Sequence, residues 1–422
     1  MSTVNLRHDL ILADDNIRLR EGAGRGLSIA LLGLGALLTV LAVLGAVAGD
    51  ALTARTALFA LHTGFILSVA FPLTALVLVM IFHATNAGWS ATIRRQFENI
   101  ASLIWIAVPF FFGILILQAV LTATKGEGGS IPYLWKWMNA AYVEGDPAFE
   151  HKRGYLNYGF FLVRSLIYFA IWIGLSFALN SISRRQDEDG DPKHTITLGR
   201  LSCIGLPFLA FSIAFAGFDW LMSLDFHWFS TMYGVYLFAS CMVLSVALGT
   251  LTLITLSSFG KLAVAFTEEH LHDLAKLLFA FTVFWAYIAF SQYFLIWYAN
   301  IPEETMFFQV RRAEPWTGLS VAIPIAHFIL PFILLLPRPL RRSRGFISFM
   351  CVYLIIIQMI ETYWMIRPEV YGVGPWHWLD FVGIVGPVAI FLGLFVAKVA
   401  SGPLIPLKDP RLHEALKHKN HI

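Results

Sequence analysis

The chain has 422 residues, of which 58% are hydrophobic, 15% aromatic and only 14% charged. Soluble domains carry about 25% charged residues, so this composition excludes an ordinary soluble protein and predicts a polytopic membrane protein. The net charge is only +3 and the basic residues lie at the ends of apolar segments, which argues against a nucleic-acid partner.

The chain contains ten stretches that are long and apolar enough to cross a bilayer, since a spanning helix needs about 20 such residues. They are Gly26–Ala48, Thr56–His83, Asn99–Leu121, Asn157–Ser183, Thr197–Leu221, Ser230–Leu256, His272–Ala299, Trp316–Leu336, Gly345–Ile366 and Trp376–Ala400. The predicted fold is therefore an all-α polytopic membrane protein with about ten transmembrane helices.

The orientation of these helices follows from the basic residues. Most of the 30 Lys and Arg residues fall on the face that carries the N-terminus. The positive-inside rule places this face in the cytoplasm, so both termini are expected to be cytoplasmic. The turn 222–229 then faces outward, as does the longest connection, Thr122–Leu156, whose Trp135 and Trp137 favour a position at the membrane interface.

The sequence offers few ligands for a metal or a haem. Cys203, Cys241 and Cys351 are far apart and lack the paired spacing of zinc or iron–sulfur sites. His62 and His327 are the histidines clearly inside predicted spans, without a recurring spacing that would favour haem. We therefore expect no redox cofactor to be held by ligands of this chain.

Ionisable residues inside spans are costly and are the first functional candidates. They are His62, Arg164, Asp219, His327, Glu361 and Asp380. Arg164, Asp219 and Glu361 fall in the outer halves of their spans, so either carboxylate could be the counter-ion of Arg164. Such a pair could fix the register of two helices, or it could take part in proton or quinol chemistry.

Two further features could belong to a proton pathway. His327 lies near the centre of its span between Pro324 and Pro331, which predicts either an interruption that holds water or a packed kink. His272 and Asp273 lie in an acid-rich helix start at the cytoplasmic side, where they could collect protons or simply be solvated. Tyr287 is a polar candidate further along the same span.

The stretch Phe218–Ser230 combines acids with aromatic residues and has no Lys or Arg. Asp219 or His227 could accept a proton from a quinol whose ring stacks on Trp220 and Trp228. Asp225 and His227 could equally well cap the turn, because an Asp side chain hydrogen-bonds readily to the backbone of its own turn.

Several segments together resemble the F subunit of bacterial alternative complex III. They are Phe218–Gly234, His272–Lys276, Trp285–Glu304 and His327–Pro331. The sequence differs from the family at Phe226, where proline is common, and this difference concerns only the local turn.

The resemblance implies a fold of two four-helix bundles with two flanking helices. The implied segments are a cytoplasmic N-terminal segment 1–25, a first flanking helix and loop 26–55, a first bundle 56–221, an outer turn 222–229, a second bundle 230–366, a last flanking helix 367–400 and a cytoplasmic tail 401–422.

The resemblance also implies a location in the bacterial inner membrane and a set of partners. These are a companion ten-helix subunit with the quinol site, an iron–sulfur subunit, cytochrome c subunits and, in some assemblies, a terminal oxidase, together with membrane lipid. Haem and iron–sulfur clusters would lie in the partners, and quinol or menaquinol would be the substrate of the complex.

Three functions remain open at this point. The leading hypothesis is a cofactor-free subunit that contributes a proton pathway and a docking surface to the quinol-oxidising complex. Its proton pathway would use Arg164, Asp219, Glu361, His327, His272, Asp273 and Tyr287. The second is a direct quinol site on the outer side at Asp219, Trp220, His227 and Trp228, and the third is a secondary transporter, because proline-broken helices also form transport sites.

Overall fold

A computed structural model describes residues 12–125, 134–370 and 374–420 of the chain. Within these ranges the regular structure is helical, without strands, and ten helices or helix series are long and apolar enough to cross a membrane. The prediction of an all-α polytopic membrane protein is confirmed. Gly126, Gly128, Gly129 and Pro132 of the long connection lie outside the described residues.

The spans follow one another along the chain, and the longest connection between them runs from Lys125 to Tyr158. The first five are α3 (Arg25–Ala48), α4 (Ala51–Ala84), the series α5 (Arg94–Ala101), η2 (Ile104–Ile106) and α6 (Ala107–Lys125), then α9 (Tyr158–Asp189) and α10 (Lys193–Trp220). The last five are α11 (Tyr233–Ser258), α12 (Glu268–Ala299), the series α14 (Thr317–Pro324), η5 (Ile325–Ile329) and α15 (Leu330–Leu335), then α17 (Arg344–Ile366) and α18 (Trp378–Ala400).

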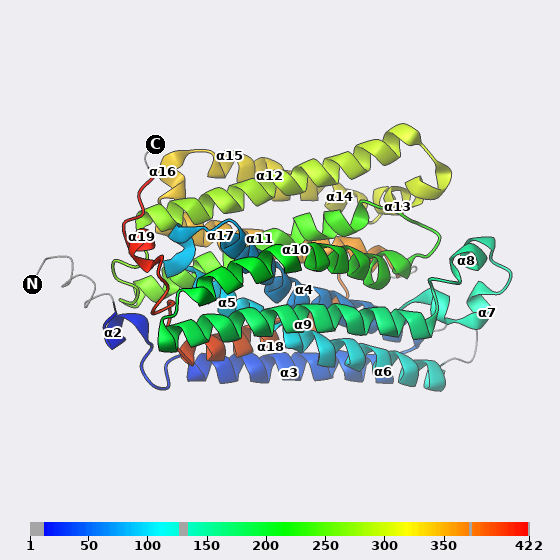
Figure 1. Cartoon of the computed structure of the whole chain (residues 1–422). Helices are drawn as coiled ribbons and strands as arrows, with labels where there is room; N and C mark the ends of the chain where they lie inside the picture. Colours follow the sequence, from blue (N-terminus) through cyan, green and yellow to red (C-terminus); the bar gives the residue numbers. More distant parts are fainter. Residues whose placement is uncertain (1–11, 126–133, 371–373, 421–422) are drawn as a thin grey trace, which may run out of the picture.

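Short helices lie in the connections and near the ends of the chain. They are α2 (Asp14–Ile17), η1 (Gly88–Thr92), η3 (Lys136–Met138), α7 (Ala140–Val143), α8 (Pro147–Lys152), η4 (Met222–Leu224), α13 (Pro302–Arg312), α16 (Arg338–Arg341), η6 (Arg367–Glu369) and α19 (Leu412–Leu416). Figure 1 shows α2 and α19 at the same end of the molecule, and α7, α8 and α13 at the other. We call the first the termini end and the second the far end.

The helix α4 lies at the centre of the molecule. In its most apolar stretch 94% of the residues are buried, whereas in that of α3 only 17% are buried. The helix α4 contacts α3, α10, α11, α17 and α18, while α3 and α18 run side by side along one edge (Figure 1). The helices α5 to α10 group with α4, and α12 to α17 group with α11, so the two groups meet along α4, α10 and α11.

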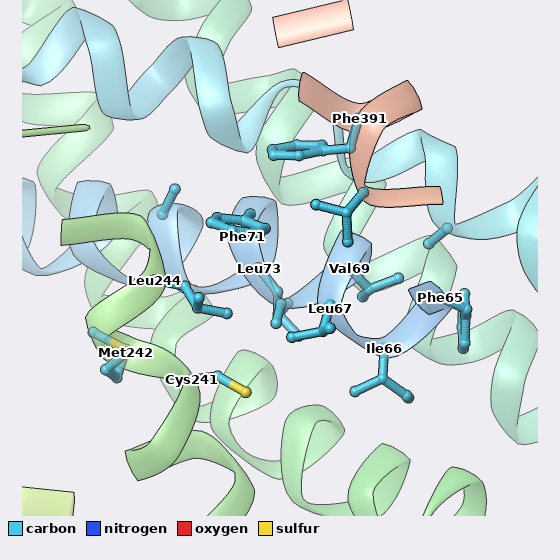
Figure 2. Close-up of a cluster of buried hydrophobic side chains, with 14 of the residues drawn as sticks. Phe65, Ile66, Leu67, Val69, Phe71, Leu73, Cys241, Met242, Leu244 and Phe391 are labelled. Atoms are coloured by element: carbon cyan, nitrogen blue, oxygen red, sulfur yellow. The ribbon is translucent and has the colours of Figure 1, made fainter. Parts of the chain in front are cut away.

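The middle of the molecule is apolar where α4, α11 and α18 meet. Figure 2 shows Leu67 and Leu73 of α4 near Leu244 of α11, and Phe71 facing Phe391 of α18. The rings of Phe71 and Phe391 stack with their centroids 5.1 Å apart. The seam where α4, α11 and α18 meet is thus filled with apolar side chains (Figure 2).

The predicted spans agree with the observed helices to within six residues at each end, and the start of the third span shows one cause of the differences. That helix was expected to begin at Asn99, but it begins at Arg94. The charged residues Arg94, Arg95 and Glu98 are buried in ion pairs inside the protein, so they continue the helix instead of preceding it.

Candidate functional site

The carboxyl group of Glu361 forms the centre of the most enclosed polar cluster in the second group of helices. Glu361 lies on α17, eight residues or about 12 Å from the end of this span at Glu369, and is fully buried. Its Oε1 accepts hydrogen bonds from the Tyr236 hydroxyl at 2.5 Å and from the Trp285 indole N–H at 2.7 Å. Its Oε2 lies 2.7 Å from Nδ1 of His327.

Four spans therefore supply this cluster, which we call the Glu361 cluster: Tyr236 from α11, Trp285 from α12, His327 from η5 and Glu361 from α17. The rings of His327 and Trp285 stack with centroids 4.0 Å apart and planes at 21°. One side chain each from α11, α12 and η5 thus holds the carboxyl group of Glu361 in position. Such convergence of donors stabilises a charge that would be costly to bury alone.

The local backbone explains how His327 reaches Glu361. Residues Ile325–Ile329 form a π-helical turn between α14 and α15, and turns of this kind often occur at functional sites. In a π-turn the carbonyl of Ala326 would accept the N–H of residue 331, but this residue is proline and has no N–H. The hydroxyl of Tyr353 donates to this carbonyl at 2.7 Å instead. The prediction of an irregular helix at His327 thus corresponds to a packed π-turn.

The pair of His327 and Glu361 can hold a proton and exchange it. Nδ1 of the imidazole and Oε2 of the carboxyl group lie 2.7 Å apart, which is hydrogen-bond distance, so a proton can pass between these two atoms. The other ring nitrogen of His327, Nε2, is buried and has no hydrogen-bond partner among the described residues. A proton that arrives on the pair could therefore leave through a different atom from the one on which it arrived.

A cavity of about 750 Å³ lies against this cluster, between α12, α13, α14 and η5. Tyr236 and Trp285 line it from inside, together with aromatic side chains such as Phe308 and Trp364. Phe290, Tyr293, Val321 and Ile329 line it as well and are exposed on the outside of the helices, so the cavity opens at the apolar outer surface of the chain. A lipid-soluble molecule could enter it from the membrane.

One polar atom of this cavity is unsatisfied. The side chain of Gln292 is 3% exposed and lines the cavity, and its Oε1 accepts no hydrogen bond from any described residue. A buried acceptor without a donor costs about 1–3 kcal/mol. A hydroxyl group on a bound molecule, or a water molecule, would satisfy it.

A second buried charge cluster lies in the first group of helices. Arg164 of α9 and Asp219 of α10 form two hydrogen bonds, Nε to Oδ2 and Nη2 to Oδ1, both at 2.8 Å. The Tyr168 hydroxyl also donates to Asp219, at 2.7 Å, and the guanidinium group lies 3.8 Å from the ring centroid of Tyr155. The counter-ion of Arg164 is therefore Asp219, and Glu361 belongs to a separate cluster.

The aromatic residues around Asp219 and His227 have structural contacts of their own. Trp220 is 2% exposed and donates to Ser165, and Trp228 is 3% exposed and stacks on Phe307 with ring centroids 4.5 Å apart. His227 is half exposed and lies 2.7 Å from Asp146. The four residues of the expected outer quinol site thus lie in different surroundings: Asp219 and Trp220 are buried in the first group of helices, Trp228 packs on Phe307 of α13, and His227 is at the surface.

The contact between His227 and Asp146 also affects the acidity of Asp146 at the surface of the protein. The hydrogen bond from His227 holds the pKa of Asp146 below its usual range. Asp225 accepts from the backbone N–H of His227, which is the turn-capping arrangement expected as the alternative for these residues.

The remaining predicted pathway residues are not part of the Glu361 cluster. Tyr287 is 66% exposed on the outer face of α12. Asp273 accepts from Lys276 and contacts His418 of the C-terminal segment, and His272 is buried without a hydrogen-bond partner in the part of the chain that is described. Asp273 lies twelve residues, or about 18 Å, from Trp285 along α12.

Sequence reasoning missed two partners of Glu361 and one whole cluster. Tyr236 and Trp285 carry no charge, and nothing in the sequence shows which way their side chains face. The missed cluster consists of Arg94, Arg95, Glu98, Asp187, Asp409 and Arg411 at the termini end. Its basic residues look like the positive residues that commonly flank spans, so they gave no signal of burial.

Searches with the sequence find no matching family profile and no similar curated protein. Within the described residues, no three His, Cys, Asp or Glu side chains come together as a group that could hold a metal ion. The function is therefore inferred from the clusters and the cavity, and the resemblance to alternative complex III remains an expectation.

Proposed function

We propose that this chain is an integral membrane subunit of a quinol-oxidising electron-transfer complex of the alternative complex III type, in which Glu361 and His327 carry protons. The chain would lie in the bacterial inner membrane with the termini end in the cytoplasm. It would dock to a companion ten-helix subunit and to iron–sulfur and cytochrome c subunits, which would hold the redox cofactors.

One observation carries the proton-transfer part of this proposal: a carboxylate and an imidazole are buried together about 12 Å inside a span. A purely structural pair is usually an Arg or Lys with an acid, as between Arg164 and Asp219. The Glu361 pair instead consists of an imidazole and a carboxyl group, each of which has an atom that can bind a proton, and ionisable residues in such positions mark proton relays.

The test replaces Glu361 by Gln, which keeps the shape and removes the ionisable group. In the complex reconstituted into vesicles, we expect Glu361→Gln to lower the protons moved per electron while quinol oxidation continues. Glu304→Gln is the control, because Glu304 lies on α13 outside the cluster and should leave both quantities unchanged. Unchanged proton movement in Glu361→Gln would refute the proposal.

The cavity favours a second candidate function, direct binding of a quinol. It is lined by aromatic side chains, opens at the apolar outer surface of the chain, ends on two hydrogen-bond donors of Glu361 and contains the unpaired Oε1 of Gln292. A quinol ring could pack on these walls and donate a hydroxyl hydrogen to Gln292. In this candidate function the quinol binds in the cavity and not at the outer turn around Asp219 and His227.

A photoreactive quinone analogue distinguishes this candidate. We expect it to label peptides of α12 or α14, and Ala289→Phe, which fills the cavity, should abolish the labelling. Val283→Phe on the exposed side of α12 is the matched control and should be labelled like the unmodified protein. Labelling elsewhere, or labelling that survives Ala289→Phe, would rule out the cavity as the quinol site.

A further inference from the structure

A cluster of alternating charges is buried at the termini end of the first group of helices. Nε of Arg94 lies 2.8 Å from Oε1 of Glu98, and its Nη2 lies 2.7 Å from Oδ2 of Asp409. Arg95 contacts Glu98 at 2.9 Å and also contacts Asp187 of α9. Arg94 and Arg95 are both fully buried, although each is charged.

This cluster leaves several buried polar atoms unpaired. Arg94 Nη1, Gln96 Oε1 and Asn99 Oδ1 have no hydrogen-bond partner among the described residues, and the same holds for both ring nitrogens of His83. His83 is 4% exposed and lies within electrostatic range of Arg94 and the other charges of the cluster. All these residues lie on the end of α4 and on α5, so the unpaired atoms are concentrated in one region.

These atoms include both donors and acceptors. In a neutral histidine ring one nitrogen donates a hydrogen bond and the other accepts one. The Nη1 group of Arg94 donates, and the side-chain oxygens of Gln96 and Asn99 accept. Leaving each unpaired would cost about 1–3 kcal/mol. Water molecules make about three hydrogen bonds in such polar sites and would satisfy donors and acceptors together.

The C-terminal segment covers this region. Asp409 reaches into the cluster between Arg94 and Arg411, whose Nη2 lies 3.0 Å from Asp409 Oδ2. The backbone carbonyl of Leu404 accepts from Gln96, and the backbone N–H of Leu407 donates to Asp187. The segment is thus attached to the same residues that form the cluster.

We propose that this cluster is a water-filled chamber, closed by the C-terminal segment, through which protons from the termini side reach the interior. His83, Glu98, Asp187 and Asp409 are its titratable groups, and Arg94, Arg95 and Arg411 are its fixed positive charges. The chamber would replace His272 and Asp273 as the site of proton uptake. The proposal stands independently of Glu361 and of quinol, because it concerns the opposite end of the helices.

Cysteine accessibility tests the chamber in native membranes. In the full chain with Cys203, Cys241 and Cys351 replaced by alanine, we would introduce His83→Cys or Asn99→Cys and add a small water-soluble methanethiosulfonate. We expect both cysteines to react. Leu76→Cys, two turns further into α4 and fully buried, should stay unreactive, and Thr85→Cys on the exposed end of α4 should react fastest.

The closure is tested by Asp409→Ala, which removes the contact with Arg94. We expect the labelling of His83→Cys to become several-fold faster in this background, with Leu76→Cys still unreactive. If His83→Cys and Asn99→Cys are both as unreactive as Leu76→Cys, the cluster is dry and the chamber is refuted. If Asp409→Ala leaves the labelling rate unchanged, the C-terminal segment does not close it.

Discussion

At the scale of single residues, this protein buries ionisable side chains in two kinds of contact. Arg164 and Asp219 form a pair with two parallel hydrogen bonds, in which each charge is neutralised by the other. Glu361 instead accepts from Tyr236 and Trp285 and pairs with an imidazole. The first arrangement links α9 to α10 through opposite charges, and the second is the one to which we assign proton transfer in the proposed function.

The Arg164 pair should therefore contribute strongly to stability. We expect Arg164→Leu to lower the free energy of unfolding by about 3–5 kcal/mol, because it leaves the Asp219 charge buried and unpaired. The measurement is the midpoint of thermal unfolding in detergent.

The control for this variant is Arg153→Leu, which removes a partner of Glu150 in an exposed pair with an N–O distance of 3.7 Å. An exposed pair is worth about 0–1 kcal/mol, so this variant should unfold almost like the unmodified protein. Equal effects of the two substitutions would show that Arg164 is not a structural anchor.

The sequence pointed to Arg164, Asp219, His327 and Glu361 because an ionisable residue inside an apolar run stands out. It could not assign their partners, since hydrogen bonds between helices depend on how each helix is rotated. Burial of Arg94 was missed for the opposite reason. Its neighbours Arg95 and Gln96 in the sequence are polar, and its contact with Asp409 depends on the packing of the C-terminal segment.

At the scale of elements, the series α14, η5 and α15 determines where His327 lies. Predicting an irregular helix here was possible from Pro324 and Pro331, because proline removes a donor. Predicting a π-turn was not, since its geometry also depends on the hydroxyl of Tyr353 from α17. The lengths of the other spans followed from hydropathy, because the bilayer fixes how many apolar residues a helix needs.

The contact of Tyr353 gives a test at this scale. We expect Tyr353→Phe to lower the free energy of unfolding by about 0.5–1.5 kcal/mol, since the carbonyl of Ala326 loses its donor. Tyr287→Phe on the exposed face of α12 should have no such effect in the same thermal unfolding assay. A stability of Tyr353→Phe equal to that of Tyr287→Phe would mean that the π-turn does not need this hydrogen bond.

At the scale of the whole molecule, the Glu361 cluster and the charge cluster around Arg94 lie in different groups of helices, and the seam between α4, α11 and α18 is apolar (Figure 2). The C-terminal segment completes the cluster at the termini end, which links residues far apart in the sequence, such as Arg94 and Asp409. Burial alone would raise the pKa of Asp409, but the positive charges of Arg94 and Arg411 hold this pKa well below its usual range.

This depressed pKa predicts how stability depends on pH. A carboxyl group whose pKa is lower in the folded state stabilises the protein fully above its unfolded pKa of about 3.9, and this stabilisation is lost progressively as the pH falls from that value towards the lower pKa of the folded state. We therefore expect Asp409→Asn to lower the unfolding midpoint most near pH 7, and by a smaller amount at about pH 3, where the stabilisation is only partly lost. A difference that stays constant between these two pH values would contradict the ion pair.

The most direct test of the central claim is infrared difference spectroscopy of the reconstituted complex as quinol is added. The proposed function requires the carboxyl group of Glu361 to change its protonation during turnover. We predict a carboxyl C=O band that appears or shifts on reduction, moves in deuterium oxide and is absent in Glu361→Gln. A difference spectrum in the carboxyl region that is the same with and without Glu361 would contradict the claim.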